Sequence, residues 1–312
     1  MTEAGAGSVA ATPPWPAGAA WIGGRYCPVE EAKISVLDLG VTRSDAAYDV
    51  VHVWRRRFYR LDDHLDRFSA SLARLRLDPG HDRAGIEAIL HGCVRLAGLR
   101  EAYVSMTCTR GRVEPGRRDL RTARATFYCY AVPFVWIIAP DRQAAGARLW
   151  ISPVTRIPPQ SVDPVIKNYH WLDMDVAQLD AYDHDAELVV LRDASGAITE
   201  GPGYNVFAHT GGRWLTPARG TLQGITRRSV IEIAGQAGHP VQEGRLTAED
   251  LRRADEVLVT STAGGIMPVV VVDGEPVGAG VPGPLTAQVR DEYWRRHEDP
   301  RFSTPVRYDE RL

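Results

Sequence analysis

Short apolar runs separated by turn residues occupy the first part of the chain. The runs are AAWIGGRYCP (residues 19–28), KISVLDLGV (33–41) and DVVHVWRRRFYRL (49–61). This pattern is typical of strands joined by tight turns, with the arginine triplet at 55–57 as a solvated hairpin tip. We therefore predict antiparallel strands across residues 20–60.

The spacing becomes helical after Asp62. Apolar residues there recur at intervals of three or four positions up to Pro79-Gly80, namely Leu65, Phe68, Leu72 and Leu75. Residues 84–98 repeat this spacing, so the pattern predicts two helices. Residues 103–111 and 125–138 are rich in β-branched and aromatic side chains. They predict two more strands, joined by a long polar surface loop at 110–124.

The second half combines short strands with helices. Its pattern predicts a helix at about 169–183, strands between residues 186 and 217, and a helix at 225–238 that Gly238 stops. DEVLVTST (255–262) is typical of a buried strand, and VVVVDGEPV (269–277) is typical of a hairpin on Asp-Gly.

A proline-rich passage, SPVTRIPPQSVDP (152–164), separates the two halves and is the candidate domain boundary. We expect a loose arm at 1–17, a small α+β domain at 18–150, a linker at 151–158 and a larger domain at 159–312. The fold class predicted is α+β with two domains.

Composition narrows the classes of partner. The 312 residues are 44% hydrophobic and 24% charged, and a net charge of −2 argues against nucleic acid or an anionic membrane surface. The chain contains no run of about 18 apolar residues, so the sequence predicts no membrane span. The N-terminus lacks the pattern of a secretion signal. Four cysteines show no spacing typical of a metal site or disulfide framework: Cys27, Cys93, Cys108 and Cys129. We expect a cytoplasmic protein with reduced thiols and no metal.

Lysine is almost absent from the chain. Of 37 basic residues only Lys33 and Lys167 are lysines, so 37 − 2 = 35 are arginines. An arginine stays protonated in proteins, whereas a desolvated lysine can lose its proton and become a nucleophilic amine. Lys167 lies in VDPVIKNYHWLD among apolar and aromatic residues, which makes it a candidate for this chemistry. The alternative is a surface lysine in a linker.

Two further elements fit the same chemistry. Glu200 lies in ITEGPGYNVF and is followed by Gly201 and Gly203. Its carboxylate could keep the nitrogen of an aromatic ring protonated. The two glycines, which lack side chains, would let the backbone approach such a flat ring. The alternative is a turn with an exposed acid.

The third element is a candidate anion site. LQGITRRSVIEIA places Ile225 and Thr226 at a helix start, where free N–H groups favour a phosphate, and TSTAGG supplies Thr262. A threonine at a helix start is more often only a cap. Together, the lysine, the carboxylate and the anion site fit the demands of pyridoxal 5′-phosphate.

The order of these motifs along the chain resembles that of a known enzyme family. The order HxxR, lysine, EGxxxN, GITR and STAGG resembles the fold-type IV pyridoxal-phosphate enzymes, which include branched-chain aminotransferases, D-amino-acid aminotransferases and aminodeoxychorismate lyases. Longer stretches, among them VHVWRRRFYRLDDHLDRF and SVDPVIKNYHW, resemble the (R)-selective amine transaminases. The resemblance runs from Gly18 to the C-terminus.

The resemblance implies a small N-terminal α/β domain, a larger C-terminal pseudo-barrel domain, and a homodimer with active sites at the subunit junction. It implies Lys167 as the Schiff-base lysine and general base, and Glu200 as the partner of the pyridine nitrogen. The phosphate ligands that it implies are Arg67, Ile225, Thr226 and Thr262.

The substrate pocket is expected on one strand and one loop. Alternate residues of a strand face one side, which groups Tyr48, Val50, His52 and Trp54. His52 could instead be a hydrogen-bonded core histidine. By resemblance, Arg118 in PGRRD is the arginine that swings toward a substrate carboxylate; the alternative is a solvated charge cluster.

Trp171 also belongs to the expected pocket. The chain departs from the family branch at Leu172, where a small residue is usual, and at Pro202. We expect Leu172 either to narrow the pocket or to shift preference toward amino acids.

The reaction expected is transamination in two half-reactions. The leading interpretation is transfer of an amino group from an (R)-amine or a D-amino acid such as D-alanine to a keto acid or ketone. The alternatives are a D-amino-acid or branched-chain aminotransferase, an aminodeoxychorismate lyase-like enzyme, and a non-catalytic phosphate-binding relative.

Overall fold

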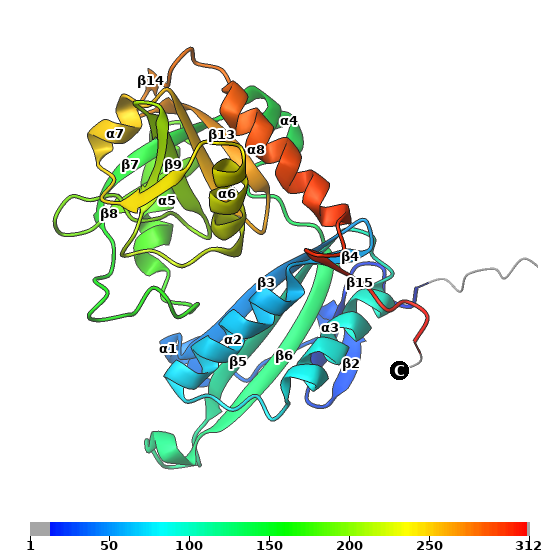
Figure 1. Cartoon of the computed structure of the whole chain (residues 1–312). Coiled ribbons are helices and arrows are strands. Elements are labelled where there is room, and N and C mark those ends of the chain that lie inside the picture. The colour runs from blue at the N-terminus through cyan, green and yellow to red at the C-terminus, as the bar shows by residue number, and fades with distance from the viewer. Residues whose placement is uncertain (1–12, 311–312) are drawn as a thin grey trace, which may run out of the picture.

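Most apolar runs of the first half form one antiparallel sheet (Figure 1). In the computed structural model, which describes residues 13–310, seven strands follow the order β15-β4-β3-β5-β6-β1-β2, each antiparallel to its neighbours. The strands are β1 (Ala19–Ile22), β2 (Arg25–Pro28), β3 (Ala46–Trp54), β4 (Arg57–Tyr59), β5 (Ala102–Arg112), β6 (Arg124–Pro133) and β15 (Ser303–Pro305).

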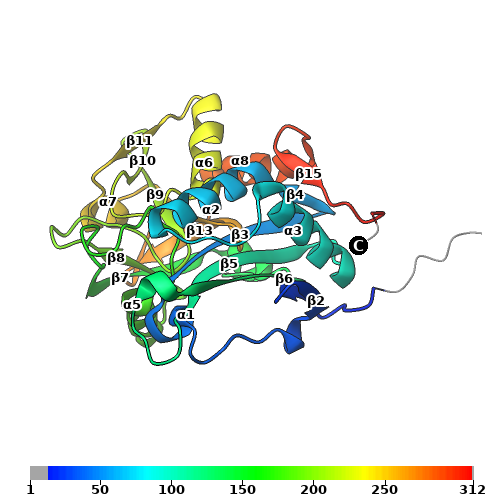
Figure 2. The same cartoon turned by 90° about the horizontal axis from the view of Figure 1, so that it is seen from below.

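Two helices cover one face of this sheet (Figure 2), because their apolar residues fall on one side. They are α2 (Leu61–Leu75) and α3 (Arg83–Ala97), which pack on β3 and on β1 and β6 respectively. Phe68 and Leu90 are fully buried between the helices and the sheet, and burying a side chain of this size contributes roughly 1.5–3 kcal/mol. Shorter helical segments are η1 (Val29–Glu31), α1 (Leu39–Arg43) and η2 (Leu120–Thr122).

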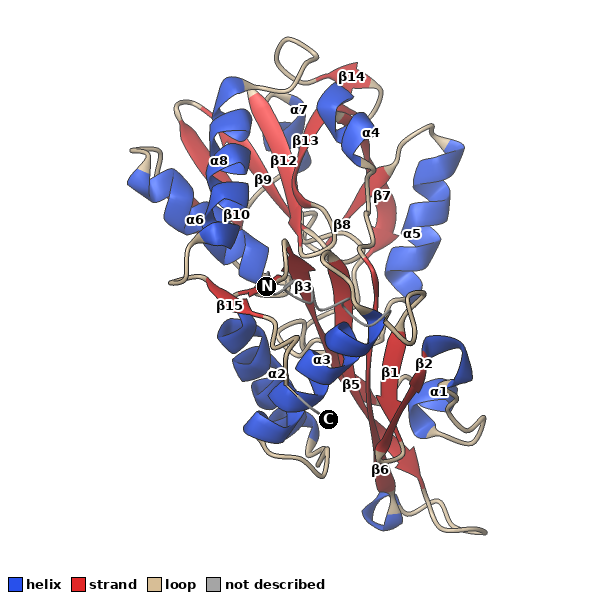
Figure 3. Cartoon of the chain, turned by 90° about the vertical axis from the view of Figure 1, so that its right-hand side faces the viewer, coloured by secondary structure: helices blue, strands red, loops and turns tan. Residues whose placement is uncertain are grey.

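The second half forms a mixed sheet that curls around its own apolar core (Figure 3). Its strands follow the order β11-β10-β9-β12-β13-β7-β8, with β14 paired to β13. They are β7 (Ala147–Thr155), β8 (Leu188–Arg192), β9 (Asn205–Thr210), β10 (Arg213–Pro217), β11 (Val241–Gly244), β12 (Glu256–Ser261), β13 (Gly265–Val272) and β14 (Glu275–Pro276).

Helices lie on both sides of the second sheet. α6 and α8 pack together over β12 and β13, and α5 packs on β7 and β8 (Figure 3). The helices are α4 (Pro140–Ala145), α5 (Leu172–Asp183), α6 (Ile225–Gln236), α7 (Ala248–Arg252), α8 (Pro284–Arg295) and η3 (Arg296–Glu298). Two sheets with separate cores confirm the predicted two-domain α+β class.

The domain boundary differs from the expected one. Residues 151–155, expected in the linker, continue β7, whose parallel pairing with β13 and β8 makes it part of the second sheet. The chain therefore crosses between sheets at residues 134–146. The C-terminal part also departs from the expected range of 159–312, because β15 returns to pair with β4 of the first sheet. Long-range pairing of this kind leaves no local signal in the sequence.

Most predicted elements are confirmed, and one is wrong. Residues 33–41 form a loop and α1 rather than a strand, with Val36 and Leu37 exposed. Asp38 starts α1 by accepting a hydrogen bond from the Gly40 N–H, so a local cap overrides the apolar run. In the predicted arm, residues 1–12 lie outside the described residues, while Trp15 donates a backbone hydrogen bond to Leu96 of α3 at 3.3 Å.

The two domains meet along the segment that carries Lys167. The Tyr48 N–H donates to the Lys167 carbonyl at 3.0 Å, and the Lys167 N–H donates to Ser71 Oγ at 3.2 Å. The carboxylates of Asp63 on α2 and Glu232 on α6 each pair with an arginine of the opposite domain. These contacts place the start of α6 against β3 and α2.

Among residues 13–310 no helix is long and apolar enough to cross a membrane, and no cluster of three metal-ligating side chains is found. All four cysteines are buried and free.

Candidate active site

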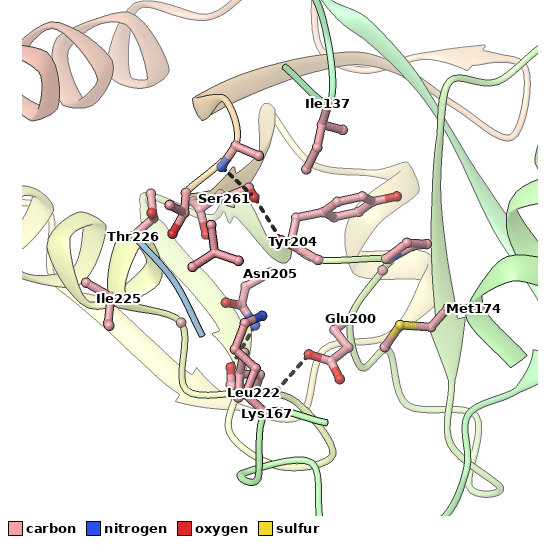
Figure 4. A pocket seen from close by; sticks show the side chains of 18 of the residues that line it. Ile137, Lys167, Met174, Glu200, Tyr204, Asn205, Leu222, Ile225, Thr226 and Ser261 are labelled. Atoms are coloured by element: carbon pink, nitrogen blue, oxygen red, sulfur yellow. Dashed lines mark hydrogen bonds between the residues drawn. The ribbon is translucent and has the colours of Figure 1, made fainter. Parts of the chain in front are cut away.

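A cavity of about 240 Å³ lies where the two domains meet. Its walls come from β3, the loop before α5, residues 200–205, the start of α6 and the turn after β12 (Figure 4). Sequence-predicted site residues that line it are Tyr48, Val50, Arg67, Lys167, Trp171, Glu200, Ile225, Thr226 and Thr262. The structure thus brings together side chains that lie up to 214 positions apart in the sequence (262 − 48 = 214).

Lys167 reaches into the cavity beside an aromatic wall. Its Nζ donates to the Tyr48 hydroxyl at 3.3 Å and lies 4.4 Å from the centre of the Tyr48 ring. Tyr169 stacks on the other side of Tyr48, with ring centres 4.4 Å apart. Burial, helped by the charge of Arg67, lowers the pKa of Lys167 to about 8, because desolvation disfavours the ammonium. At pH 7 about a tenth of an amine with this pKa is neutral and nucleophilic, compared with well under 0.1% for free lysine.

Glu200 lies across the cavity from Thr226 (Figure 4). One carboxylate oxygen accepts hydrogen bonds from the Leu222 N–H at 2.8 Å and the Thr221 hydroxyl at 3.1 Å. The other accepts one from Arg156 at 3.3 Å. Burial raises the pKa of Glu200 above its usual value, while Arg156 and the other donors act against this rise. A more basic carboxylate is a better acceptor for a proton on a ring nitrogen.

Arg67 is held by a buried carboxylate. Its Nε and Nη2 donate to the two oxygens of Asp49 at 2.7 and 2.8 Å, and its Nη1 donates to the Gln223 carbonyl at 3.2 Å. A guanidinium carries five N–H donors, so two remain for a ligand in the cavity. The nearby positive charge of Arg67, with hydrogen bonds from Arg67 and His64, lowers the pKa of Asp49 despite its burial.

The start of α6 lines the cavity and is suited to an anion. Gly224 caps the helix without a side-chain hydrogen bond, so the first-turn N–H groups have no cap. A side chain at Gly224 would meet Asn205 Oδ1 at 2.1 Å, so only glycine fits there. Opposite, the Ser261 hydroxyl donates to the Gly203 carbonyl at 2.8 Å and accepts from the Ala263 N–H at 3.1 Å, which shapes the turn of Thr262 (Figure 4).

His52 and Trp54 do not line the cavity. They continue the same face of β3 but lie further along it, where α8 and η3 cover the strand. His52 Nε2 is 2.7 Å from His297 Nε2 and the residue is buried, so the core-histidine alternative describes it. Trp54 packs against Trp294. The alternation along the strand was right, but the cavity spans only its first part.

Leu172 and Arg118 lie outside the cavity as well. Leu172 is the first residue of α5 and its side chain is 76% exposed, so the expectation that it narrows the pocket is wrong. Helix geometry turns it outward, whereas Met174 points in. Arg118 is exposed in the loop between β5 and β6 and does not contact this chain's own cavity.

The flanking glycines, Gly201 and Gly203, both line the cavity. A side chain at Gly201 would meet the Tyr204 ring and the Val189 carbonyl, each at 2.2 Å. At Gly203, a side chain would meet Trp171 at 3.3 Å. Packing within the protein therefore requires glycine at 201.

Sequence reasoning missed Arg156, Asn205 and Leu222, which all line the cavity. Arg156 pairs with Asp173 at 2.8 Å as well as with Glu200. It lies in the proline-rich passage that was interpreted as a linker, so its position hid its role. Asn205 belongs to the EGxxxN motif, which was the one available signal.

The residues present fit pyridoxal 5′-phosphate. Thr260 Oγ1 lines the cavity and is buried without a hydrogen-bond partner among the described residues, as expected of a group that awaits a ligand. The uncapped start of α6 and the spare donors of Arg67 suit a phosphate dianion. A neutral lysine and a buried carboxylate suit an aldehyde and a pyridine nitrogen.

Comparisons with known proteins agree with this site. Residues 46–272 match the family model for amino-transferase class IV. A putative branched-chain-amino-acid aminotransferase of Methanocaldococcus jannaschii is 29% identical over 88% of this chain and 94% of its own length. A D-alanine aminotransferase of Bacillus licheniformis is 27% identical over 86% of this chain and 93% of its own.

A solved structure adds the cofactor. A branched-chain amino acid aminotransferase from T.th., solved with pyridoxamine 5′-phosphate, is 29% identical, with a TM-score of 0.86 over 94% of this chain and 99% of that one. This chain therefore belongs to the class IV aminotransferases and is a fold-type IV transaminase that uses pyridoxal 5′-phosphate.

Proposed function

We propose that the protein transfers an amino group from an (R)-amine or a D-amino acid such as D-alanine to a keto acid or ketone. The observation that carries the chemistry is the Lys167 amine in the cavity, with a pKa lowered to about 8. Support for this donor class comes from the resemblance of β3 and the Lys167 segment to (R)-selective amine transaminases, and from the D-alanine aminotransferases among the relatives.

Each cavity residue has a role in this proposal. When bound, the cofactor supplies an aldehyde that holds the amino group and a ring that accepts electrons. Lys167 would hold the cofactor through its amine, and once freed this amine would move the proton on the substrate carbon. Glu200 holds the proton of the ring nitrogen. The phosphate ligands are Arg67, Thr226, Thr262 and the backbone of Ile225.

The substrate side of the cavity is mainly apolar. Tyr48, Val50, Trp171, Val135 and Ile137 line it, which suits the hydrocarbon groups of an amine. No spare cation for a substrate carboxylate lies on this wall among the described residues, apart from those already paired. We propose that Arg118 supplies this charge in the cavity of a partner subunit.

The partner we propose is a second copy of the chain. The outer face of α5 exposes an apolar stripe of Leu172, Leu179 and Tyr182 (76, 64 and 58%) next to exposed carboxylates such as Asp175. The loop between β5 and β6 exposes arginines such as Arg117 and Arg118, and at its base Arg112 of β5 and Arg124 of β6 face each other across the strands. Like charges that face each other on paired strands repel. The carboxylates on α5 of a second copy would neutralise these arginines, so the two surfaces are complementary in charge.

A half-reaction screen tests the donor class. The loaded enzyme is mixed with (R)- and (S)-1-phenylethylamine, D- and L-alanine, and L-leucine, and the absorption band of the bound cofactor is followed. We expect loss of the band with the (R)-amine and D-alanine. Loss with L-leucine but not with the (R)-amine would establish the branched-chain alternative, which the branched-chain relatives favour.

The remaining alternatives have their own tests. Release of pyruvate without an amino acceptor would establish a lyase. Failure of Lys167→Ala to remove the band of the bound cofactor would show that Lys167 is not the attachment point. The expected cytoplasmic location stays a prediction from the sequence.

A further inference from the structure

We infer that Asn205 donates a hydrogen bond to Thr221, which in turn donates one to Glu200. This relay keeps the Glu200 carboxylate ionised and orients it toward the cofactor ring. Thr221 is a positioning residue, since it acts through Glu200. The inference rests on the proposed role of Glu200 as the partner of the ring nitrogen.

The three side chains form a chain of short contacts beneath the cavity. Asn205 Nδ2 donates to Thr221 Oγ1 at 2.6 Å, and Thr221 Oγ1 donates to Glu200 Oε2 at 3.1 Å. All three residues are buried, with 4, 2 and 5% of their surfaces exposed. Hydrogen bonds in a site of low dielectric are stronger than in water, and unpaired groups there are costly.

The direction of the relay follows from what each group can do. Asn205 Nδ2 also lies 2.9 Å from the Leu222 carbonyl, which only accepts, so the amide presents its NH₂ group to this side. Thr221 Oγ1 must therefore accept from Asn205. Its single hydrogen is left for Glu200, because the Leu222 carbonyl is 3.5 Å away and too far to compete.

Every protein neighbour of the carboxylate is a donor. Besides Thr221, the Leu222 N–H donates to Oε2 at 2.8 Å and Arg156 donates to Oε1 at 3.3 Å. An ionised carboxylate has about four acceptor positions, so about one stays open, on the oxygen that Arg156 contacts. A proton on Glu200 would occupy this open position, which is the one left for the N–H of the ring.

The relay offsets the effect of burial. Desolvation raises the pKa of Glu200, and the Thr221 hydroxyl is among the groups that lower it. Without that hydroxyl the carboxylate would bind a proton more tightly, because a hydrogen bond to its charged form would be lost. The shared proton would then move from the ring nitrogen toward Glu200, and the ring would withdraw electrons less effectively.

The test uses the enzyme loaded with pyridoxal 5′-phosphate that carries ¹⁵N in its ring, and reads the ¹⁵N chemical shift, which reports protonation of that nitrogen. Thr221→Val removes the hydroxyl and keeps the shape, while Thr221→Ser keeps the hydroxyl. Glu200→Gln marks the shift of a ring without its carboxylate partner. Thr221→Ala replaces Thr221→Val if the valine variant does not bind the cofactor.

We expect Thr221→Val to move the ¹⁵N shift from the wild-type value toward the Glu200→Gln value, through a change of about tenfold in the ratio of the two proton positions. Thr221→Ser should stay at the wild-type value. Equal shifts for wild type and Thr221→Val, with Glu200→Gln displaced, would overturn the relay and leave the role of Glu200 intact. An undisplaced Glu200→Gln would instead refute that role, and with it the relay. A Thr221→Ser shift as large as that of Thr221→Val would assign the effect to packing.

Discussion

Asp49 is the buried charge on which the position of Arg67 depends. It is fully buried on β3 and accepts from Arg67 Nε, Arg67 Nη2, His64 Nδ1 and the Val50 N–H, all between 2.7 and 2.8 Å. The change Asp49→Asn removes the negative charge and turns one acceptor into a donor. At least one of these neighbours then faces another donor in the core.

The magnitude follows from burial. Removing one partner of a buried ion pair costs about 3–5 kcal/mol, because the other charge stays buried and unpaired. The matched control is Asp62→Asn, which removes the Arg83–Asp62 pair at 2.7 Å on the surface, where the Asp62 side chain is 80% exposed. A surface pair of this kind contributes about 0–1 kcal/mol.

The assay is urea unfolding of the protein without added cofactor, so that ligand binding does not contribute. We expect Asp49→Asn to lower the free energy of unfolding by about 3–5 kcal/mol and Asp62→Asn by at most about 1 kcal/mol. Losses of equal size in the two variants would refute the argument that the Asp49–Arg67 pair stabilises this wall of the cavity.

The contribution of Asp49 to folding stability depends on pH and decreases in acid. The folded-state pKa of Asp49 lies below its unfolded value, so its contribution is complete above the unfolded pKa of about 3.9. The contribution is lost as pH falls through the lowered folded-state pKa. The stability difference between wild type and Asp49→Asn should therefore shrink in acid.

Three further changes test other parts of the structure. In the apoprotein, pyridoxal phosphate can be attached to Lys167 and the product trapped by reduction. The extent of attachment should rise with pH around a midpoint near 8, the lowered pKa of this amine. A midpoint near 10.4, the value of free lysine, would contradict the desolvation of Lys167. Gly201→Ala should lower the free energy of unfolding by about 1–3 kcal/mol through overpacking, because the added carbon meets a backbone carbonyl at 2.2 Å. This loss of stability should exceed that of Gly211→Ala, where nothing lies within 4 Å of the added carbon. Leu172→Ala should leave the KM for amine donors unchanged within about twofold, since a side chain that is 76% exposed does not shape the cavity; a large drop in KM would restore the view that it narrows the pocket.

Local patterns in the sequence were sufficient for most elements and for the cofactor chemistry. The 3.6-residue spacing that ends at Pro79-Gly80 marked α2, and the Asp-Gly turn marked the hairpin of β13 and β14. The scarcity of lysine singled out Lys167, because only lysine supplies an amine that desolvation can neutralise. Such signals depend on neighbours in the chain and so can be read without a structure.

Contacts between distant residues were decided by the tertiary structure alone. The return of β15 to the first sheet, the place of β7 in the second, and the pairing of Arg156 with Glu200 join segments that no sequence pattern links. The strand pattern put His52 on the right face of β3, but only packing against η3 showed that it lies beyond the cavity. Periodicity determines which way a side chain points, whereas the elements packed against it determine what it meets there.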